Sequence, residues 1–234
     1  MSDHDEIFQA RLNRIKETHR VELGRTALIV VDMQHGFLDE GASLEVPNGQ
    51  KILPNIVRLV GECRSKSVPV IFTEFVYSMT IPYLRGDPFG VEHLPAAKGV
   101  KTGFGTESNN CLIGPDAGEG VESALTVDDL APRDDELVVL AHTYDKFYGT
   151  HLDLALRSQG IERIMVTGVT TDVCVNCTIL SAAKRNYRVI AVADGMATIH
   201  DHIHDACLQI WQNKFARIAT TNELLKELDE ILHA

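Results

Sequence analysis

The chain has 234 residues, with 22 basic and 33 acidic side chains and a formal net charge of −11 at pH 7. Its hydrophobic content of 44% and charged content of 24% are ordinary for a globular protein and exclude the disordered, collagen-like and coiled-coil classes. The acidic balance and the lack of a basic tract argue against nucleic acid or an anionic membrane as the main partner.

The first 24 residues are predicted to form a charged helical extension on the surface. They have no apolar signal core, and no stretch of the sequence approaches the roughly 18 apolar residues of a membrane span. The five cysteines, an odd number without a secretion signal, indicate free thiols in a reducing compartment. We therefore expect a cytoplasmic protein.

Short β-branched runs alternate with helical patterns along the rest of the chain. The runs predict six strands, at Thr26–Asp32, Val68–Phe75, Leu137–Ala141, Glu162–Thr167, Arg188–Ala193 and Phe215–Ala219. The helical patterns lie at Lys51–Lys66, Gly149–Gln159, Thr171–Asn186, Ile199–Asn213 and Thr221–His233. This alternation predicts an α/β fold in which helices cover both faces of a parallel sheet, within one domain over residues 1–234.

One connection is unusually long. Residues 76–136 show no clear strand and contain several prolines. Long irregular loops in compact domains are often lids or binding loops, so we predict a lid region here.

Two reactive side chains follow predicted strands. In an open parallel sheet, ligands bind beyond the carboxyl ends of the strands. Asp32 ends the first predicted strand, and Cys174 follows the fourth in what is predicted to be the first turn of a helix, where backbone N–H groups favour a thiolate. If the two meet, they form a base beside a thiol. The alternatives are a small buried Cys174 and a loop-capping Asp32.

Other motifs give weaker support for metal or redox chemistry. Cys174 and Cys177 form a C-x-x-C without a second such pair, and His200 and His204 share a helix face without an evident third ligand. There is no P-loop and no G-x-G-x-x-G motif. We expect neither a cofactor nor a bound transition metal.

Three segments in one order carry a family resemblance: Ala27–Gln34 (ALIVVDMQ), Tyr144–Thr150 (YDKFYGT) and Gly168–Val175 (GVTTDVCV). With them the chain resembles the isochorismatase-like cysteine hydrolases, which include N-carbamoylsarcosine amidohydrolase, ureidoacrylate amidohydrolases, biuret hydrolase and nicotinamidase. The resemblance implies a three-layer α/β/α sandwich whose six-stranded, mainly parallel sheet has the order 3-2-1-4-5-6.

The resemblance also implies a catalytic aspartate, lysine and cysteine. Cys174 matches the nucleophile and Asp32 the acid/base. A non-proline cis peptide would join Val169 to Thr170, and the N–H groups of Thr170 and Cys174 would face the oxyanion.

The lysine is where the sequence departs from the family pattern. Counting back nine residues from Thr150, or three from Tyr144, places the family lysine at Ala141, while Lys146 falls where the family has a small residue. We therefore expect that position 141 has lost its lysine, by divergence or by an engineered change. Lys146 remains a fallback lysine, because its stem is long and flexible.

The predicted function is cysteine-dependent hydrolysis of a linear C–N bond in a small amide, carbamoyl or ureido compound, through a thioester. No histidine follows the second strand as it does in nicotinamidases, which favours a metal-free branch. The alternatives are vinyl-ether hydrolysis of the isochorismatase type and a catalytically silent small-molecule binding protein. We expect a homo-oligomer, either a dimer or a tetramer. The predicted pocket residues are Gln34, Phe37, Phe75, Tyr77, Tyr144 and Thr171.

Overall fold

The computed structural model describes residues 3–42, 44–76, 78, 111, 113 and 122–231. Its helices are α1 (Asp3–Thr18), α2 (His35–Leu38), α3 (Gly49–Ser65), α4 (Leu152–Ser158), α5 (Asn176–Lys184), α6 (Asp201–Lys214) and α7 (Thr221–Ile231), with a 3₁₀ turn at Asp128–Leu130 and a π-helical turn at Thr171–Val175. Its strands are β1 (Thr26–Val31), β2 (Val70–Phe75), β3 (Leu137–Ala141), β4 (Arg163–Val169), β5 (Arg188–Ala197) and β6 (Ala216–Ala219).

The six strands form one parallel sheet with the order β3-β2-β1-β4-β5-β6. This confirms the predicted α/β class and strand order. Every residue of β1, β2 and β4 is buried, as expected for strands covered on both faces, and this explains their nearly continuous apolar sequences.

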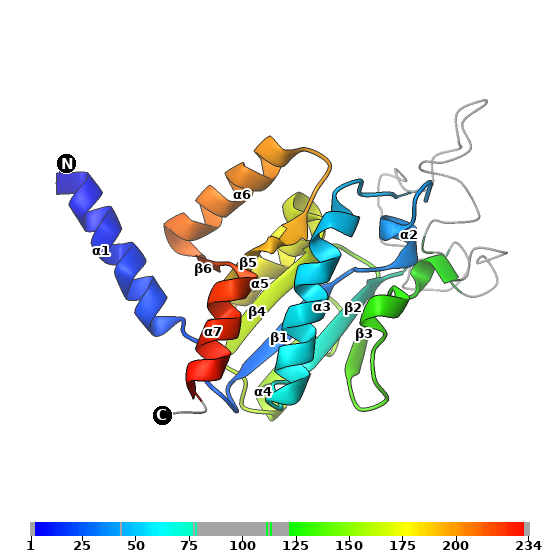
Figure 1. Ribbon diagram of the computed structural model, residues 1–234, viewed down its shortest axis with the longest axis horizontal. Helices are drawn as coiled ribbons and strands as arrows, with labels where there is room; N and C mark the ends of the chain where they lie inside the picture. Colours follow the sequence, from blue (N-terminus) through cyan, green and yellow to red (C-terminus); the bar gives the residue numbers. More distant parts are fainter. Residues whose placement is uncertain are drawn as a thin grey trace.

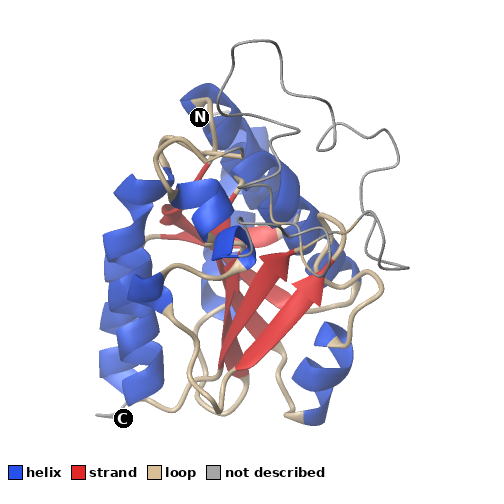
Figure 2. Cartoon of the chain, turned by 90° about the vertical axis from the view of Figure 1, so that its right-hand side faces the viewer, coloured by secondary structure: helices blue, strands red, loops and turns tan. Residues whose placement is uncertain are grey.

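Helices lie on both sides of the sheet (Figures 1 and 2), and a separate apolar core fills each interface. On one face α3 and α7 pack with side chains that include Ile56 and Leu224. On the other face α4, α5 and α6 contribute side chains that include Leu156, Ile179 and Trp211. The two cores fix the sheet rigidly, so the loops at its edge are held in a defined arrangement.

Some predicted boundaries shift where the backbone leaves regular geometry. The helix expected at Gly149–Gln159 begins only at Leu152, because Gly149 has a left-handed φ of 69°. The helix expected at Thr171–Asn186 opens with the π-helical turn before α5 begins. In the part of the chain that the structure describes, no helix is both long enough and apolar enough to cross a bilayer.

Gly168 allows β4 to pass close to β1. It pairs with Val31 in the sheet and has a φ of 114°, and a Cβ atom at this position would collide with the carbonyl oxygen of Val31. A side chain here would push apart the two strands that lead to Asp32 and Cys174.

We predict that Gly168→Ala lowers the free energy of unfolding by about 3 kcal/mol or more, because both the backbone conformation and the space oppose a methyl group. Urea denaturation measures the change. Gly61→Ala is the control, because Gly61 lies inside α3 with no atom within 4 Å of its Cβ position, and it should stabilise the protein by about 0.5–1 kcal/mol. Equal effects of the two substitutions would contradict the prediction.

Candidate active site

The reactive side chains meet at the carboxyl edge of the sheet. Asp32 directly follows β1, and Cys174 lies in the π-helical turn that follows β4, the strand next to β1. The Cys174 thiol lies close enough to Asp32 and Lys146 for both groups to act on its pKa. The peptide bond between Val169 and Thr170, where β4 ends, is cis, as the resemblance implies.

Asp32 is fully buried and has partners on both oxygens. Its Oδ2 lies 2.7 Å from Nζ of Lys146, which is also fully buried. Its Oδ1 accepts a hydrogen bond of 2.8 Å from Oγ1 of Thr73 on β2. Nζ of Lys146 also donates to the carbonyl oxygen of Thr143 at 3.1 Å and lies 5.2 Å from the ring centroid of Phe75. The pair is therefore held by hydrogen bonds and a cation–π contact in a region without water access.

Burial governs the protonation of the thiol. Burial raises the pKa of Cys174 well above its usual value; the Lys146 ammonium opposes the rise and the Asp32 carboxylate reinforces it. Burial alone would lower the pKa of Lys146, but the Asp32 carboxylate reverses this and the net pKa is raised. Burial therefore makes the Cys174 thiol harder to ionise than a free thiol, although the Lys146 ammonium lies close to it. This opposes the effect of a first helical turn, which favours a thiolate.

We predict that alkylation of Cys174 by iodoacetamide has a pH midpoint above the free-thiol value of about 8.5. A raised pKa means less thiolate at every lower pH, so the rate should keep rising with pH beyond that value. Peptide mass spectrometry measures the rate of Cys174 alkylation over a pH series, and the pH dependence gives the midpoint. A buried thiol reacts slowly, but this lowers the rate at every pH and leaves the midpoint unchanged. A plateau already reached near pH 7 would contradict the prediction.

Position 141 does not supply the charge in this site. Ala141 is the buried last residue of β3, paired with Phe75, and its carbonyl oxygen accepts a hydrogen bond from the Val76 N–H. The ammonium comes instead from Lys146, in the loop after β3. Of the two lysine positions considered, the structure places the fallback residue Lys146 against Asp32, while position 141 contributes only a methyl group.

The backbone around Lys146 explains this placement. Its N–H donates to Oγ1 of Thr178 on α5 at 3.4 Å, and its carbonyl oxygen accepts a hydrogen bond of 2.6 Å from Oγ1 of Thr150. These contacts fix the loop so that the stem of Lys146 runs inward. Counting positions from Thr150 and Tyr144 could not reveal this, because it measures separation along the chain and not the direction of a side chain.

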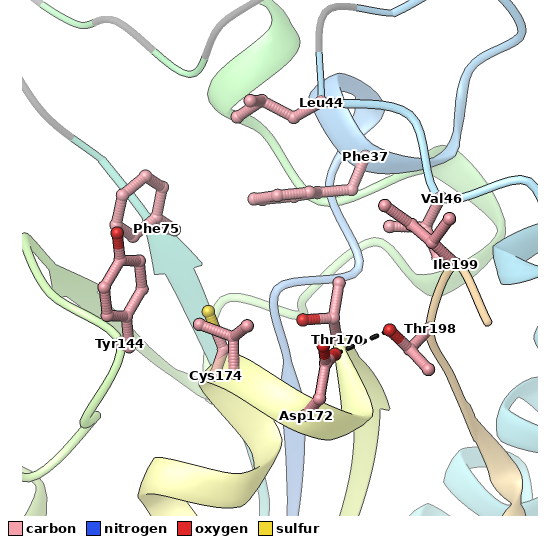
Figure 3. Close-up of a pocket in the computed structure, with 11 residues that line it drawn as sticks. Phe37, Leu44, Val46, Phe75, Tyr144, Thr170, Asp172, Cys174, Thr198 and Ile199 are labelled. Atoms are coloured by element: carbon pink, nitrogen blue, oxygen red, sulfur yellow. Dashed lines mark hydrogen bonds between the residues drawn. The ribbon is translucent and has the colours of Figure 1, made fainter. Parts of the chain in front are cut away.

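A cavity of about 160 Å³ opens onto Cys174. Figure 3 shows the sulfur directed into the space between the aromatic rings of Phe75 and Tyr144 and that of Phe37. The rings of Phe75 and Tyr144 are stacked, with centroids 5.9 Å apart, and Phe37 meets Phe75 edge-on at 6.3 Å. The cavity is lined by Phe37, Leu44, Val46, Phe75, Tyr144, Thr170, Asp172, Val173, Cys174, Thr198 and Ile199.

Two predicted pocket residues have other contacts. Gln34 is fully buried, and its side-chain amide donates to the carbonyl oxygens of Phe75 and Ala124 at 2.9 and 2.8 Å and accepts from the Phe75 N–H at 2.7 Å. It therefore fastens the end of β1 to β2 and to a neighbouring loop, and does not line the cavity. Thr171 is also buried outside the cavity, with Oγ1 3.0 Å from Nδ1 of His204.

Tyr77, the remaining predicted pocket residue, lies outside the described residues. Conversely, the sequence interpretation did not single out Thr73, Asp172, Thr198 or Ile199. Thr73 could have been found, because it is a polar residue inside the buried strand β2, near the strand's carboxyl end. Thr198 and Ile199 could not, because they reach the site only through the extension of β5 beyond its apolar run.

The histidine-rich stretch has a structural contact at this edge. His204 contacts Thr171, and the rings of His200 and His202 stack with centroids 5.7 Å apart. Within the described ranges, no three or more His, Cys, Asp or Glu side chains are grouped as they would be around a metal ion.

Comparison with known proteins agrees with this arrangement. The model of the isochorismatase domain matches residues 26–223. A ureidoacrylate amidohydrolase of Yersinia enterocolitica is 30% identical over 188 residues, which cover 78% of this chain and 80% of that protein. A protein of Arabidopsis thaliana named as a probable inactive nicotinamidase is 27% identical over 205 residues, 87% of this chain and 96% of that protein. The crystal structure of a cysteine hydrolase from Pseudomonas syringae pv. phaseolicola superposes with a TM-score of 0.73 at 26% identity, covering 90% of this chain and 95% of that one.

Proposed function

The chain belongs to the isochorismatase family, and from this premise we propose that it hydrolyses a linear C–N bond in a small amide, carbamoyl or ureido compound. The observation that carries the proposal is the position of the Cys174 thiol beside Asp32, whose Oδ2 is paired with Nζ of Lys146 at 2.7 Å. This arrangement provides a nucleophile, a proton acceptor and a fixed positive charge within one buried cluster.

The first half of the reaction forms a thioester. Sγ of Cys174 attacks the carbonyl carbon while Asp32 accepts the thiol proton. The Lys146 ammonium favours this step, because it lowers the pKa of the thiol against the effect of burial. When the C–N bond breaks, Asp32 gives its proton to the leaving nitrogen. The products are ammonia or an amine and an acyl or carbamoyl group bound to Cys174.

The second half releases the bound group. Asp32, ionised again, takes a proton from a water molecule as the water oxygen attacks the thioester carbon. The C–S bond then breaks and the proton returns to Sγ. We assign the N–H groups of Thr170 and Cys174 to the oxyanion in both halves. Their location supports this role, because Thr170 lines the cavity beside Cys174, and the second N–H belongs to Cys174 itself.

The test is a screen for ammonia release from ureido acids, biuret and primary amides. Acid quenching during turnover, followed by peptide mass spectrometry, should reveal the acyl or carbamoyl adduct on the peptide that holds Cys174. Release of ammonia without such an adduct would contradict the covalent route, and the absence of both would contradict the proposed function.

Alkylation of Cys174 and a binding assay distinguish amide hydrolysis from the two alternative functions. Vinyl-ether hydrolysis needs no cysteine nucleophile, so that activity would survive modification of Cys174, whereas amide hydrolysis would not. A silent binding protein would bind small ureides without turnover. The position of the Lys146 ammonium against Asp32 supports turnover over silent binding.

A further inference from the structure

The cavity beyond the thiol is mainly apolar. Its apolar walls come from separate segments of the chain: the α2 region, the loop before α3, the end of β2, the loop after β3 and the end of β5. Four of these side chains are almost fully buried, and they are Phe37, Leu44, Val46 and Phe75. Such a surface stabilises a bound hydrocarbon or aryl group by removing it from water.

The size of the cavity limits that group. Its volume of about 160 Å³ is close to that of a buried apolar cavity known to hold one benzene molecule, about 150 Å³. The stacked pair of Phe75 and Tyr144 and the edge-on Phe37 provide walls suited to a flat ring or a chain of similar volume.

The described lining of the cavity carries a negative charge. Asp172 is the charged side chain among the described lining residues, and its Oδ1 accepts a hydrogen bond of 2.6 Å from Oγ1 of Thr198 (Figure 3). None of the described lining residues is a lysine or arginine, and the Lys146 ammonium is already paired with Asp32. A substrate carboxylate would lose water beside the Asp172 carboxylate, and the described lining offers it no cation in return.

We propose that the substrate is a neutral amide or ureide whose non-reacting part is an apolar group about the size of a benzene ring. Compounds that carry a carboxylate on that part are rejected. The inference rests on the proposed function and separates this chain from a ureidoacrylate amidohydrolase, whose named substrate is a carboxylate.

The test compares matched pairs by ammonia release. Hexanamide and adipamate have the same chain and amide, but adipamate ends in a carboxylate. We expect kcat/KM to be at least about 100-fold higher for hexanamide. Equal values, or a higher value for adipamate, would overturn the inference while leaving the proposed hydrolase function intact. If neither compound is hydrolysed, the proposed function is left to the wider screen of ureido compounds and amides, and binding to Cys174→Ala decides the inference. Calorimetry must then show hexanamide binding at least about tenfold tighter than adipamate, and equal binding overturns the inference.

A positive charge introduced at the mouth of the cavity should reduce the preference for hexanamide. Ile199 lines the cavity with 57% of its surface exposed, so Ile199→Arg can place a guanidinium there without entering the core. We predict that Ile199→Arg lowers the ratio of kcat/KM for hexanamide to kcat/KM for adipamate at least about tenfold.

Ile210→Arg is the matched control, because Ile210 is 54% exposed on α6 and is not among the residues that line the cavity. It should leave the ratio of the two substrates unchanged. Should Ile199→Arg fail to change the ratio, or should Ile210→Arg change it equally, the discrimination does not arise in this cavity and the inference is wrong.

Discussion

Lys146→Met is expected to lower kcat/KM by about 10²–10³, the usual effect of removing one preorganised charge from an active site. The ammonium is the group that lowers the pKa of Cys174 against burial, and its loss leaves the thiol harder to ionise. Methionine keeps the length and apolar stem of lysine, so the change removes the charge with little loss of packing. Ammonia release measures the activity.

The same substitution should also destabilise the protein. It leaves the fully buried Asp32 carboxylate without its cation. Removing one partner of a buried ion pair lowers the free energy of unfolding by about 3–5 kcal/mol. The double variant Asp32→Asn/Lys146→Met removes both charges and should recover most of this stability without recovering activity. Lys226→Ala, at an exposed lysine on α7, is the control and should change neither quantity.

Ala141→Lys tests the corrected position of the lysine. Because Ala141 is fully buried at the end of β3 and Lys146 already contacts Asp32, a second lysine should not raise kcat and should destabilise the fold. A rise of tenfold or more in kcat, together with full activity of Lys146→Met, would show that position 141 is the working position after all.

The strands were predictable because a strand that is buried on both faces has a mainly apolar sequence. β1 and β2 are mainly apolar runs, and the sequence predicted each within two residues at either end. The strand order came from the family resemblance, since apolar runs do not say which strand lies beside which. Once the order is known, the neighbouring positions of β1 and β4 require Asp32 and Cys174 to meet at the same edge.

The less predictable parts depend on side-chain direction. Gln34 looked like a pocket residue because it follows Asp32 closely, yet its amide turns away to bond the backbone of Phe75 and Ala124. Lys146 looked misplaced because spacing in a loop does not fix where a long side chain ends. The π-helical turn that holds Cys174 has no sequence pattern of its own, and burial there raises the thiol pKa that a helix N-terminus would lower.

Cys174→Ser is expected to produce the largest loss, about 10⁴-fold or more in kcat/KM, as for loss of the nucleophile in other covalent hydrolases. Serine fits the same space beside Asp32, but its hydroxyl is far less acidic than a thiol, so Asp32 is a much poorer base for it. Stability should change little, so that the loss can be assigned to chemistry.

Cys177→Ser is the matched control for this loss. Cys177 lies only three residues further along the same helical segment, is half-buried and does not line the cavity. It should retain activity within about threefold, because its thiol takes no part in the covalent step. If Cys177→Ser is as inactive as Cys174→Ser, the two cysteines act together in a C-x-x-C and the single-nucleophile mechanism is wrong. If Cys174→Ser retains full activity, the reaction proceeds by direct attack of water, and the Asp32–Lys146 pair must then act on that water instead of on a thiol.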